Sequence, residues 1–288
     1  MGPLDLHRTL APLRHAPDDP TQRRERDGSL WRATRTPDGP ASCRLQQEAG
    51  QVRVQAWGPG AAWVLEQVPQ LLGVAAEEFG HPLLDRVLRQ YPGVRIPCSA
   101  RVFESLVPAV LEQKVTGKEA REAYVRLVRR YGGPAPGPGP SGLLVPPSPE
   151  VWRQVPSWEW HRAGVDPRRM RTVQAAARVA SRLEESVGMG REDAYARLTA
   201  VPGIGEWTAA EVAVRALGDT DAVSVGDYHL AGFVGWALVG RPVDDAGMLE
   251  LLEPWRPRRA HAVRLLELSG ISSPRFGPRL TVQDHRRH

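Results

Sequence analysis

Residues 198–227 read LTAVPGIGEWTAAEVAVRALGDTDAVSVGD, and this stretch decides the fold. Pro202 ends the helix before it, because its ring fixes φ and removes the amide donor. Gly203 and Gly205 can adopt backbone angles that residues with a Cβ avoid, and they let another backbone approach closely. The pattern therefore predicts two helices joined by a tight turn over residues 201–205.

The second helix of this hairpin is expected to begin at Glu206. Its first amides have no partner inside the helix and lie at the positive end of the helix dipole, which makes this terminus an anion site. Ala209, Val212 and Ala216 recur with helical spacing, so the helix docks on a core and holds the turn rigidly. Such a bare, rigid turn suits a nucleic-acid phosphate. The alternative is an ordinary glycine-rich corner without a ligand.

A single carboxylate follows the hairpin. Leu230, Phe233 and Val234 repeat with helical spacing, so Asp227 lies at or near the start of a further helix and can accept a backbone N–H there. The short return over residues 218–222 can bring this carboxylate back beside a phosphodiester bound at the hairpin. The alternative interpretation is that Asp227 only caps its helix.

The hairpin and Asp227 resemble segments of the helix-hairpin-helix DNA glycosylases, and within them the 3-methyladenine DNA glycosylase II type. The resemblance extends to LVPAVLEQKVT at 106–116 and to Trp255-Arg256-Pro257. It implies an α+β, mostly α fold, in which an all-helical glycosylase core follows a small antiparallel β-sheet and helix domain. It also implies that the partner is double-stranded DNA with damaged bases. The implied site residues are Asp227 as the catalytic carboxylate, Pro202, Gly203, Gly205 and Thr208 as DNA contacts, and the backbone carbonyls of Thr199, Val201 and Ile204 as ligands of a Na⁺ or K⁺ ion.

The role of Asp227 also follows from the chemistry of the bond. Cleavage between a base and deoxyribose leaves positive charge on the sugar, as in other glycoside hydrolyses. A fixed carboxylate stabilises that charge and activates the attacking water. One carboxylate suffices for alkylated purines, because a base that carries a positive charge departs as a neutral molecule. We therefore expect excision of alkylated purines that leaves an abasic site.

Trp207 bears on the reaction subtype. In bifunctional relatives a lysine at this position attacks the sugar and leads to strand cleavage. An indole nitrogen is no nucleophile, so the resemblance predicts a monofunctional glycosylase without AP lyase activity. Whether Trp207 packs in the core or touches the target base stays open.

Two further sites rest on the resemblance. The loop at Gln113 and Lys114 supplies the wedge that fills the gap left by a flipped nucleotide, although Lys114 stands where an apolar residue often enters the helix. In the alkylpurine enzymes, aromatic side chains line the base pocket at the positions of Glu211 and Arg258. Glu211 can attract a cationic base or accept hydrogen bonds, whereas Arg258 would repel a cation. We hypothesise that Trp160 supplies an aromatic side chain to the base pocket instead. The alternative is that Trp160 fills space between helices.

Composition agrees with a DNA partner. The chain has 288 residues, a net charge of +5 and a pI near 9.7, which suits a polyanion. Two cysteines are too few for the four-thiolate iron–sulfur cluster of some relatives, so no cofactor is expected beyond the hairpin cation. The sequence shows no long apolar run and no signal peptide, which predicts no membrane contact and a cytoplasmic, nucleoid-associated location. Nothing in it indicates an oligomer, and a monomer is expected.

Composition shifts divide the chain. Residues 1–28 are polar and rich in Pro and Arg, and are expected to be loose. Alternating segments at 30–36, 43–48 and 52–57 predict strands, and a helix from Ala61 completes a small mixed β/α domain over residues 29–98. The remaining units are the helical glycosylase domain 99–270, which contains the Pro/Gly-rich loop 132–147, and a basic C-terminal tail 271–288.

Two local patterns lie inside the helical domain. The proline density of residues 132–147 rules out a long regular element, and the loop is expected to cross the surface. Thr116 and Glu119 predict a capping box at the start of a helix, which ends the preceding helix near Gln113.

Two other functions stay open at this point. One is a glycosylase for uracil, hypoxanthine or an oxidised base. The other is a non-catalytic protein that binds DNA through the same hairpin while Asp227 only caps its helix. The effect of Asp227→Asn on turnover separates the binder from an enzyme, and a panel of lesions separates the specificities.

Overall fold

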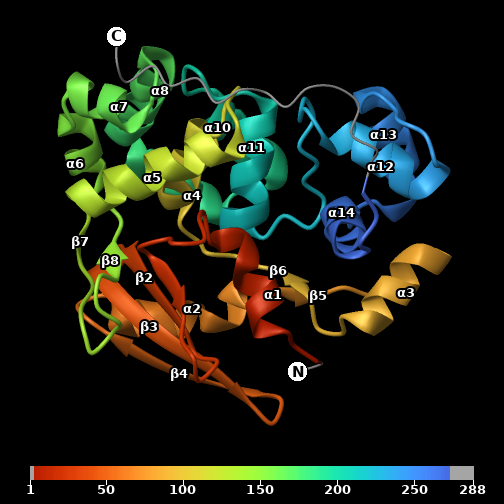
Figure 1. The fold of residues 1–288 in the computed structure, drawn as a ribbon, viewed down its shortest axis with the longest axis horizontal. Coiled ribbons are helices and arrows are strands. Elements are labelled where there is room, and N and C mark those ends of the chain that lie inside the picture. The colour runs from red at the N-terminus through yellow and green to blue at the C-terminus, as the bar shows by residue number, and fades with distance from the viewer. Residues whose placement is uncertain (1–2, 273–288) are drawn as a thin grey trace.

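The computed structural model describes residues 3–272 of the chain (Figure 1). A four-stranded sheet lies on one side of the molecule, and helices form the rest. The strands of this sheet are β1 (Gln22–Arg24), β2 (Leu30–Thr36), β3 (Gly39–Glu48) and β4 (Gln51–Trp57). The helices are α1 (Leu6–Leu10), α2 (Ala61–Leu71), α3 (Pro82–Gln90), α4 (Val102–Leu111), α5 (Gly117–Tyr131), α6 (Pro149–Gln154), α7 (Ser157–Ala163), α8 (Pro167–Arg178), α9 (Ala180–Glu184), α10 (Arg191–Thr199), α11 (Glu206–Val212), α12 (Leu230–Val239), α13 (Asp245–Leu252) and α14 (Arg259–Leu268). The α+β, mostly helical fold is therefore the one that the sequence predicted.

The N-terminal sheet is antiparallel, in the order β1-β2-β3-β4. Its register pairs Leu30 with Leu45 and Leu45 with Val54, so apolar side chains line up on one face. Val64 and Leu71 of α2 cover that face and bury Leu45 completely. The three predicted strands correspond to β2, β3 and β4, and the predicted helix corresponds to α2.

The N-terminal segment is ordered, and the expectation that it is loose is wrong. Asp5 caps α1 by accepting the amide of Arg8, and Leu6, Leu10 and Leu13 are buried in the core of the sheet. Residues 22–24 form β1 at the edge of the sheet. Leucines at helical spacing outweigh the polar composition, because burying each one contributes roughly 1.5–3 kcal/mol.

The Pro/Gly-rich loop also differs from expectation. It forms two short paired strands, β7 (Gly133–Pro134) and β8 (Leu144–Val145). Leu143 and Val145 are buried against Trp31, so the loop covers part of the sheet rather than merely crossing the surface.

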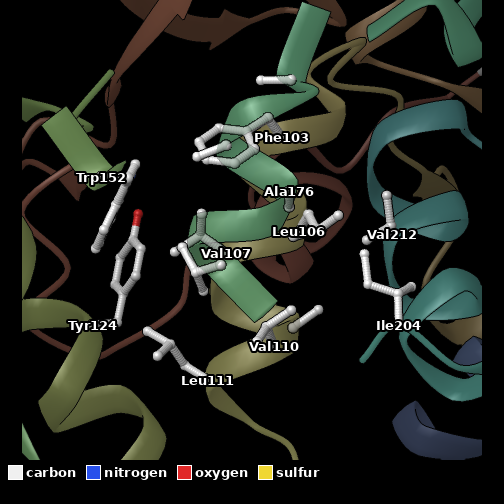
Figure 2. Close-up of a cluster of buried hydrophobic side chains, with 14 of the residues drawn as sticks. Phe103, Leu106, Val107, Val110, Leu111, Tyr124, Trp152, Ala176, Ile204 and Val212 are labelled. Carbon is white, nitrogen blue, oxygen red and sulfur yellow. The ribbon is translucent and has the colours of Figure 1, made fainter. Parts of the chain in front are cut away.

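The helical core is centred on α4. Figure 2 shows Leu106 of this helix between Tyr124 and Trp152 on one side and Ile204 and Val212 on the other. The predicted capping box is present at the start of α5. Because Ile204 belongs to the hairpin turn and Val212 to α11, this cluster fixes the hairpin to the centre of the molecule.

A second apolar cluster joins α12, α13 and α14 to α3. Leu84 and Val87 of α3 are buried there, and the indole of Trp255 donates to the carbonyl of Phe79 at 3.2 Å. The α3 segment was expected in the N-terminal β/α domain, yet it packs with these C-terminal helices. Two short antiparallel strands, β5 (Val74–Ala75) and β6 (Arg95–Ile96), pair with each other before and after α3 in the sequence.

The predicted basic tail lies almost wholly outside the described residues, which end at residue 272. Within residues 3–272, no helix has both the length and the apolar character needed to span a membrane.

Candidate active site and DNA-binding hairpin

The hairpin has the predicted form. The first helix, α10, ends at Thr199, and α11 begins at Glu206. Val201 and Ile204 are buried and point into the core, and the amide of Ile204 closes the turn on the carbonyl of Val201 at 3.0 Å. Pro202 and both glycines are exposed. The buried pair holds the turn in place while its outer backbone faces solvent.

The two glycines of the turn are required for different reasons. Gly203 has φ +92°, and a Cβ there would collide with the hydroxyl of Thr172 on α8. Gly205 has φ −101°, which any residue adopts, and a Cβ there would meet no protein atom within 4 Å. The fold therefore demands a glycine at 203 but not at 205. The bare backbone at Gly205 leaves room for a molecule outside the protein.

The α8 helix places a positive charge beside the turn. Thr172, which contacts Gly203, donates its hydroxyl to the carbonyl of Arg168 at 3.1 Å. Arg168 lies one turn earlier on the same side of α8, and it is exposed. Its guanidinium would therefore be available to a phosphate at the turn, if the hairpin amides bind one as predicted.

The predicted wedge loop is tied to the hairpin. The side-chain amide of Gln113 donates to the carbonyl of Gly203 at 3.0 Å and to the hydroxyl of Thr208 at 2.9 Å. Gln113 therefore ties the loop to the turn through the buried hydroxyl of Thr208, and the predicted DNA contacts of Gln113 and Thr208 stay predictions. Lys114, exposed and at φ +54°, is the residue at the tip.

Asp227 lies at the predicted place. Its Oδ1 accepts the amides of His229 at 2.8 Å and Leu230 at 2.9 Å, at the start of α12. Its Oδ2 accepts the indole N–H of Trp207 at 3.1 Å. Trp207 is therefore a hydrogen-bond partner of the carboxylate, and its contact with a target base stays a prediction. The aspartate is half-buried and held by three donors.

A cleft of about 340 Å³ opens beside Asp227. Its polar lining includes Glu211, Arg215 and Ser224, and Phe233 contributes an aromatic side chain. The carboxylate of Glu211 is shared between Arg215, which forms an ion pair with it, and Ser224, whose hydroxyl donates to the other oxygen. Glu211 thus faces the cleft, as predicted, with its orientation fixed.

A second carboxyl lies close to this group. Burial raises the pKa of Glu112, at the end of α4, and the negative charges of Glu211 and Asp227 raise it further, against the opposing charge of Arg215. The proton on Glu112 is therefore held to a higher pH than in a solvated glutamate.

Two predicted pocket residues lie elsewhere. The side chain of Trp160 is wholly buried, packs on Trp152 and donates its indole N–H to the carbonyl of Val155. It fills space between helices and forms no wall of the cleft. Arg258 lies over the ring of Phe79 and forms an ion pair with Glu77, so it too is absent from the lining of the cleft.

Sequence reasoning missed an ion-pair cluster at Asp221, in the segment that leads to Asp227. Asp221, which lies between α11 and Asp227, is 3% exposed and accepts two hydrogen bonds from the side chain of Arg259, at 2.7 and 2.8 Å. Arg191 of α10 adds a third donor at 3.0 Å. Burial alone would raise the pKa of Asp221, but the hydrogen bonds from Arg259 outweigh it and lower the pKa. These contacts fix the return path to Asp227.

Arg215 was missed as well, together with the N-terminal segment that contacts it. Its Nε donates to the carbonyl of Pro12 at 3.0 Å, and Pro12 itself lines the cleft. The only sequence signal was the i, i+4 spacing of Glu211 and Arg215 on one helix face.

The carbonyls predicted to bind a monovalent cation fit that role in part. The carbonyl of Val201 accepts the amide of Ile204 and keeps a second lone pair. The other two carbonyls belong to Thr199 at the end of α10 and Ile204 in the turn, and a Na⁺ or K⁺ ion there stays a prediction.

The sequence was compared with those of known proteins. No family model matches the chain. It is 33% identical over 189 residues to the probable bifunctional transcriptional activator/DNA repair enzyme AlkA of Mycobacterium tuberculosis, which covers 64% of this chain and 37% of that protein. The chain therefore spans little more than a third of the length of this curated relative.

Solved structures match over more of the chain. The 3-methyladenine DNA glycosylase of Archaeoglobus fulgidus has a TM-score of 0.77 at 21% identity, over 92% of this chain and 94% of that one. The 8-oxoguanine glycosylase/lyase of Clostridium acetobutylicum in complex with DNA has 0.69 at 12% identity, over 92% and 91%. The 3-methyladenine DNA glycosylase Mag1 of Schizosaccharomyces pombe in complex with abasic DNA has 0.53 at 21%, over 69% and 93%.

These matches show that the chain has the fold of solved 3-methyladenine and 8-oxoguanine DNA glycosylases. Its sequence is similar to that of AlkA, and its structural neighbours include 3-methyladenine DNA glycosylases from an archaeon and a yeast. The resemblance predicted from the hairpin and Asp227 is thereby confirmed.

Proposed function

We propose that this chain is a monofunctional DNA glycosylase that flips an alkylated purine out of double-stranded DNA and hydrolyses its N-glycosidic bond. The observation that carries the proposal is the position of Asp227. Its carboxylate accepts a hydrogen bond from Trp207 at the edge of a cleft. Trp207 lies in the first turn of α11, and Gly205 of the hairpin turn directly precedes that helix. A phosphate bound at the hairpin would bring the adjoining nucleotide to the carboxylate.

The chemistry at Asp227 follows from its geometry. As the bond between C1′ and the base breaks, its electron pair leaves with the base and positive charge develops on the sugar. The fixed carboxylate stabilises this charge, and it takes a proton from the water that adds to C1′. A cationic alkylated purine leaves as a neutral base, so this pathway needs no further acid. The product is an abasic site.

Trp207 supports the monofunctional assignment. Its indole N–H donates a hydrogen bond to the carboxylate, and the nitrogen has no lone pair available for attack on C1′. Among residues 3–272 the lysines are Lys114 and Lys118, and neither lines the cleft. No lysine amine among these residues is therefore placed to form a Schiff base with the sugar, and borohydride should trap no covalent complex.

The test is single-turnover excision from a duplex oligonucleotide that contains 7-methylguanine. We expect Asp227→Asn to slow excision about 100- to 10,000-fold, the range for removal of one preorganised charge or acid–base group. Asparagine keeps the cap on α12, so the fold and the duplex affinity should persist. Asp38→Asn, at an exposed turn of the sheet, is the matched control. An unchanged rate in Asp227→Asn, or no excision by the natural chain, would contradict the proposal.

A further inference from the structure

We propose that Glu211 reads the hydrogen-bonding edge of the flipped base, and that the enzyme therefore selects damaged purines that still offer an N–H donor on that edge. This inference rests on the proposed glycosylase function and narrows its substrate class.

The first argument is that the carboxylate is fixed. Arg215 forms an ion pair with one oxygen of Glu211, and the hydroxyl of Ser224 donates to the other. Arg215 is itself held, because its guanidinium donates to the carbonyls of Pro12 and Glu211 at 3.0 Å each. A side chain anchored at both oxygens cannot turn away to suit a mismatched ligand.

The second argument is that the group lines the cleft beside Asp227. The lining includes Glu211, Ser224 and Asp227 together with the apolar side chains of Leu230 and Phe233. A base whose sugar lies at Asp227 would enter this space. The apolar side chains offer it surface to pack on, and Glu211 is the fixed acceptor that it would meet.

The third argument concerns hydrogen-bond capacity. An ionised carboxylate is acceptor-only and offers about four lone-pair sites, of which Arg215 and Ser224 use two. The sites that remain require donors from the base. An amino group or a ring N–H satisfies them, whereas an acceptor atom in the same place leaves the carboxylate unpaired and repelled.

This rule separates lesions by their edge rather than by their charge. A purine methylated at position 3 or 7 keeps its donors, and hypoxanthine keeps its ring N–H. In ethenoadenine, a carbon bridge joins the amino nitrogen to the ring, and the edge carries acceptors without any N–H. Hypoxanthine and ethenoadenine are both neutral, so charge does not distinguish them, and the Glu211→Gln variant separates the effect of the donor from that of the additional ring.

The experiment compares excision of these two bases from otherwise identical duplexes under single-turnover conditions. We expect the natural chain to favour hypoxanthine by about 10- to 100-fold, the range for one hydrogen bond to a charged group. The free bases are also compared as inhibitors of 7-methylguanine excision. That readout does not depend on how easily each glycosidic bond breaks, and it should show the same order.

Two variants address the carboxylate itself. Glu211→Gln can donate as well as accept, so the preference should fall toward equality or reverse while 7-methylguanine is still excised. Ser224→Ala removes one anchor and should weaken the preference less. Glu66→Gln, at an exposed site on α2, is the matched control and should change nothing. Thermal unfolding of each variant checks that it is folded.

The outcomes separate the two proposals. Suppose that the natural chain excises 7-methylguanine, but that hypoxanthine and ethenoadenine are excised at equal rates and inhibit equally. The proposal that Glu211 recognises a donor on the base is then wrong, whereas the proposed glycosylase function is not contradicted. The same holds if Glu211→Gln leaves an existing preference unchanged. If the natural chain excises no base, the proposed function fails first.

Discussion

The hairpin and the cleft beside it are built in different ways. The hairpin uses backbone groups from one short stretch, residues 201–206, and its side chains serve mainly to hold that backbone. The cleft combines side chains from Pro12 at one end of the chain to Glu267 at the other. Under the proposed function, the grip on the DNA backbone would therefore depend on a local segment of the chain, whereas the choice of base would depend on how distant parts of the chain are assembled.

The link between the two regions is Asp221, and breaking it should have the largest effect on the fold. In Asp221→Asn the buried guanidinium of Arg259 loses its counter-charge, and we expect the free energy of unfolding to fall by about 3 kcal/mol or more. Urea unfolding at neutral pH measures this. Because Asp221 positions the return to Asp227, excision should also slow.

The pH dependence and a control sharpen this result. The pKa of Asp221 is lower in the folded chain, so its stabilisation is present above the ordinary carboxyl pKa and is lost as pH falls through the lowered value. The gap between the natural chain and the variant should therefore close in acid. Asp18→Asn breaks an exposed pair with Arg129 and should change stability by less than about 1 kcal/mol. Equal losses in both variants would contradict the account.

The two glycines of the hairpin give a paired prediction within one region. Gly203→Ala should lower stability by roughly 1–2 kcal/mol from φ strain alone, and by more if Thr172 cannot move. Gly205→Ala should leave stability unchanged and weaken duplex binding by about tenfold, because a methyl group would enter the space kept for the phosphate. Thermal unfolding and fluorescence anisotropy with a labelled duplex separate these effects. Tight binding by Gly205→Ala would show that the bare backbone has no ligand.

The features that could be predicted from the sequence are mostly those that depend on residues close together in the chain. The turn, strands β2 to β4 and the capping box at Thr116 depend on contacts between near neighbours, and each was predicted. Asp227 was also predicted, because a cap is a local feature. Composition misled at the N-terminus, where a few leucines outweigh many charges.

The side chains of the pocket were harder to predict, since nothing near them in the sequence indicates where they point. Trp160 and Arg258 had suitable chemistry, but one is drawn into the core and the other toward Phe79. For Arg215 the sequence indicated only the i, i+4 pair with Glu211, because its contact with Pro12 joins segments that are remote in sequence. Physical reasoning from spacing alone cannot supply such contacts.

A smaller effect is expected from Glu112, which belongs to the surroundings of the cleft. Its raised pKa means that the folded chain favours the protonated form, so ionisation at neutral pH weakens the fold. Glu112→Gln mimics the neutral form and should raise the urea midpoint at pH 7. The gain should vanish in acid below the ordinary glutamate pKa, where the natural residue is protonated in both states. A variant that is less stable at pH 7 would contradict this.

The smallest effect concerns the rim of the hairpin. If Arg168 neutralises one phosphate beside the turn, Arg168→Ala should lower the slope of log affinity against log salt by about 0.9. Arg53→Ala, at an exposed position on β4, should leave the slope unchanged. Excision at saturating enzyme should be equal in both, because neither residue lines the cleft. Identical salt slopes for the two variants would confine the DNA grip to the hairpin backbone, whereas a lower slope for Arg168→Ala alone would extend it along α8.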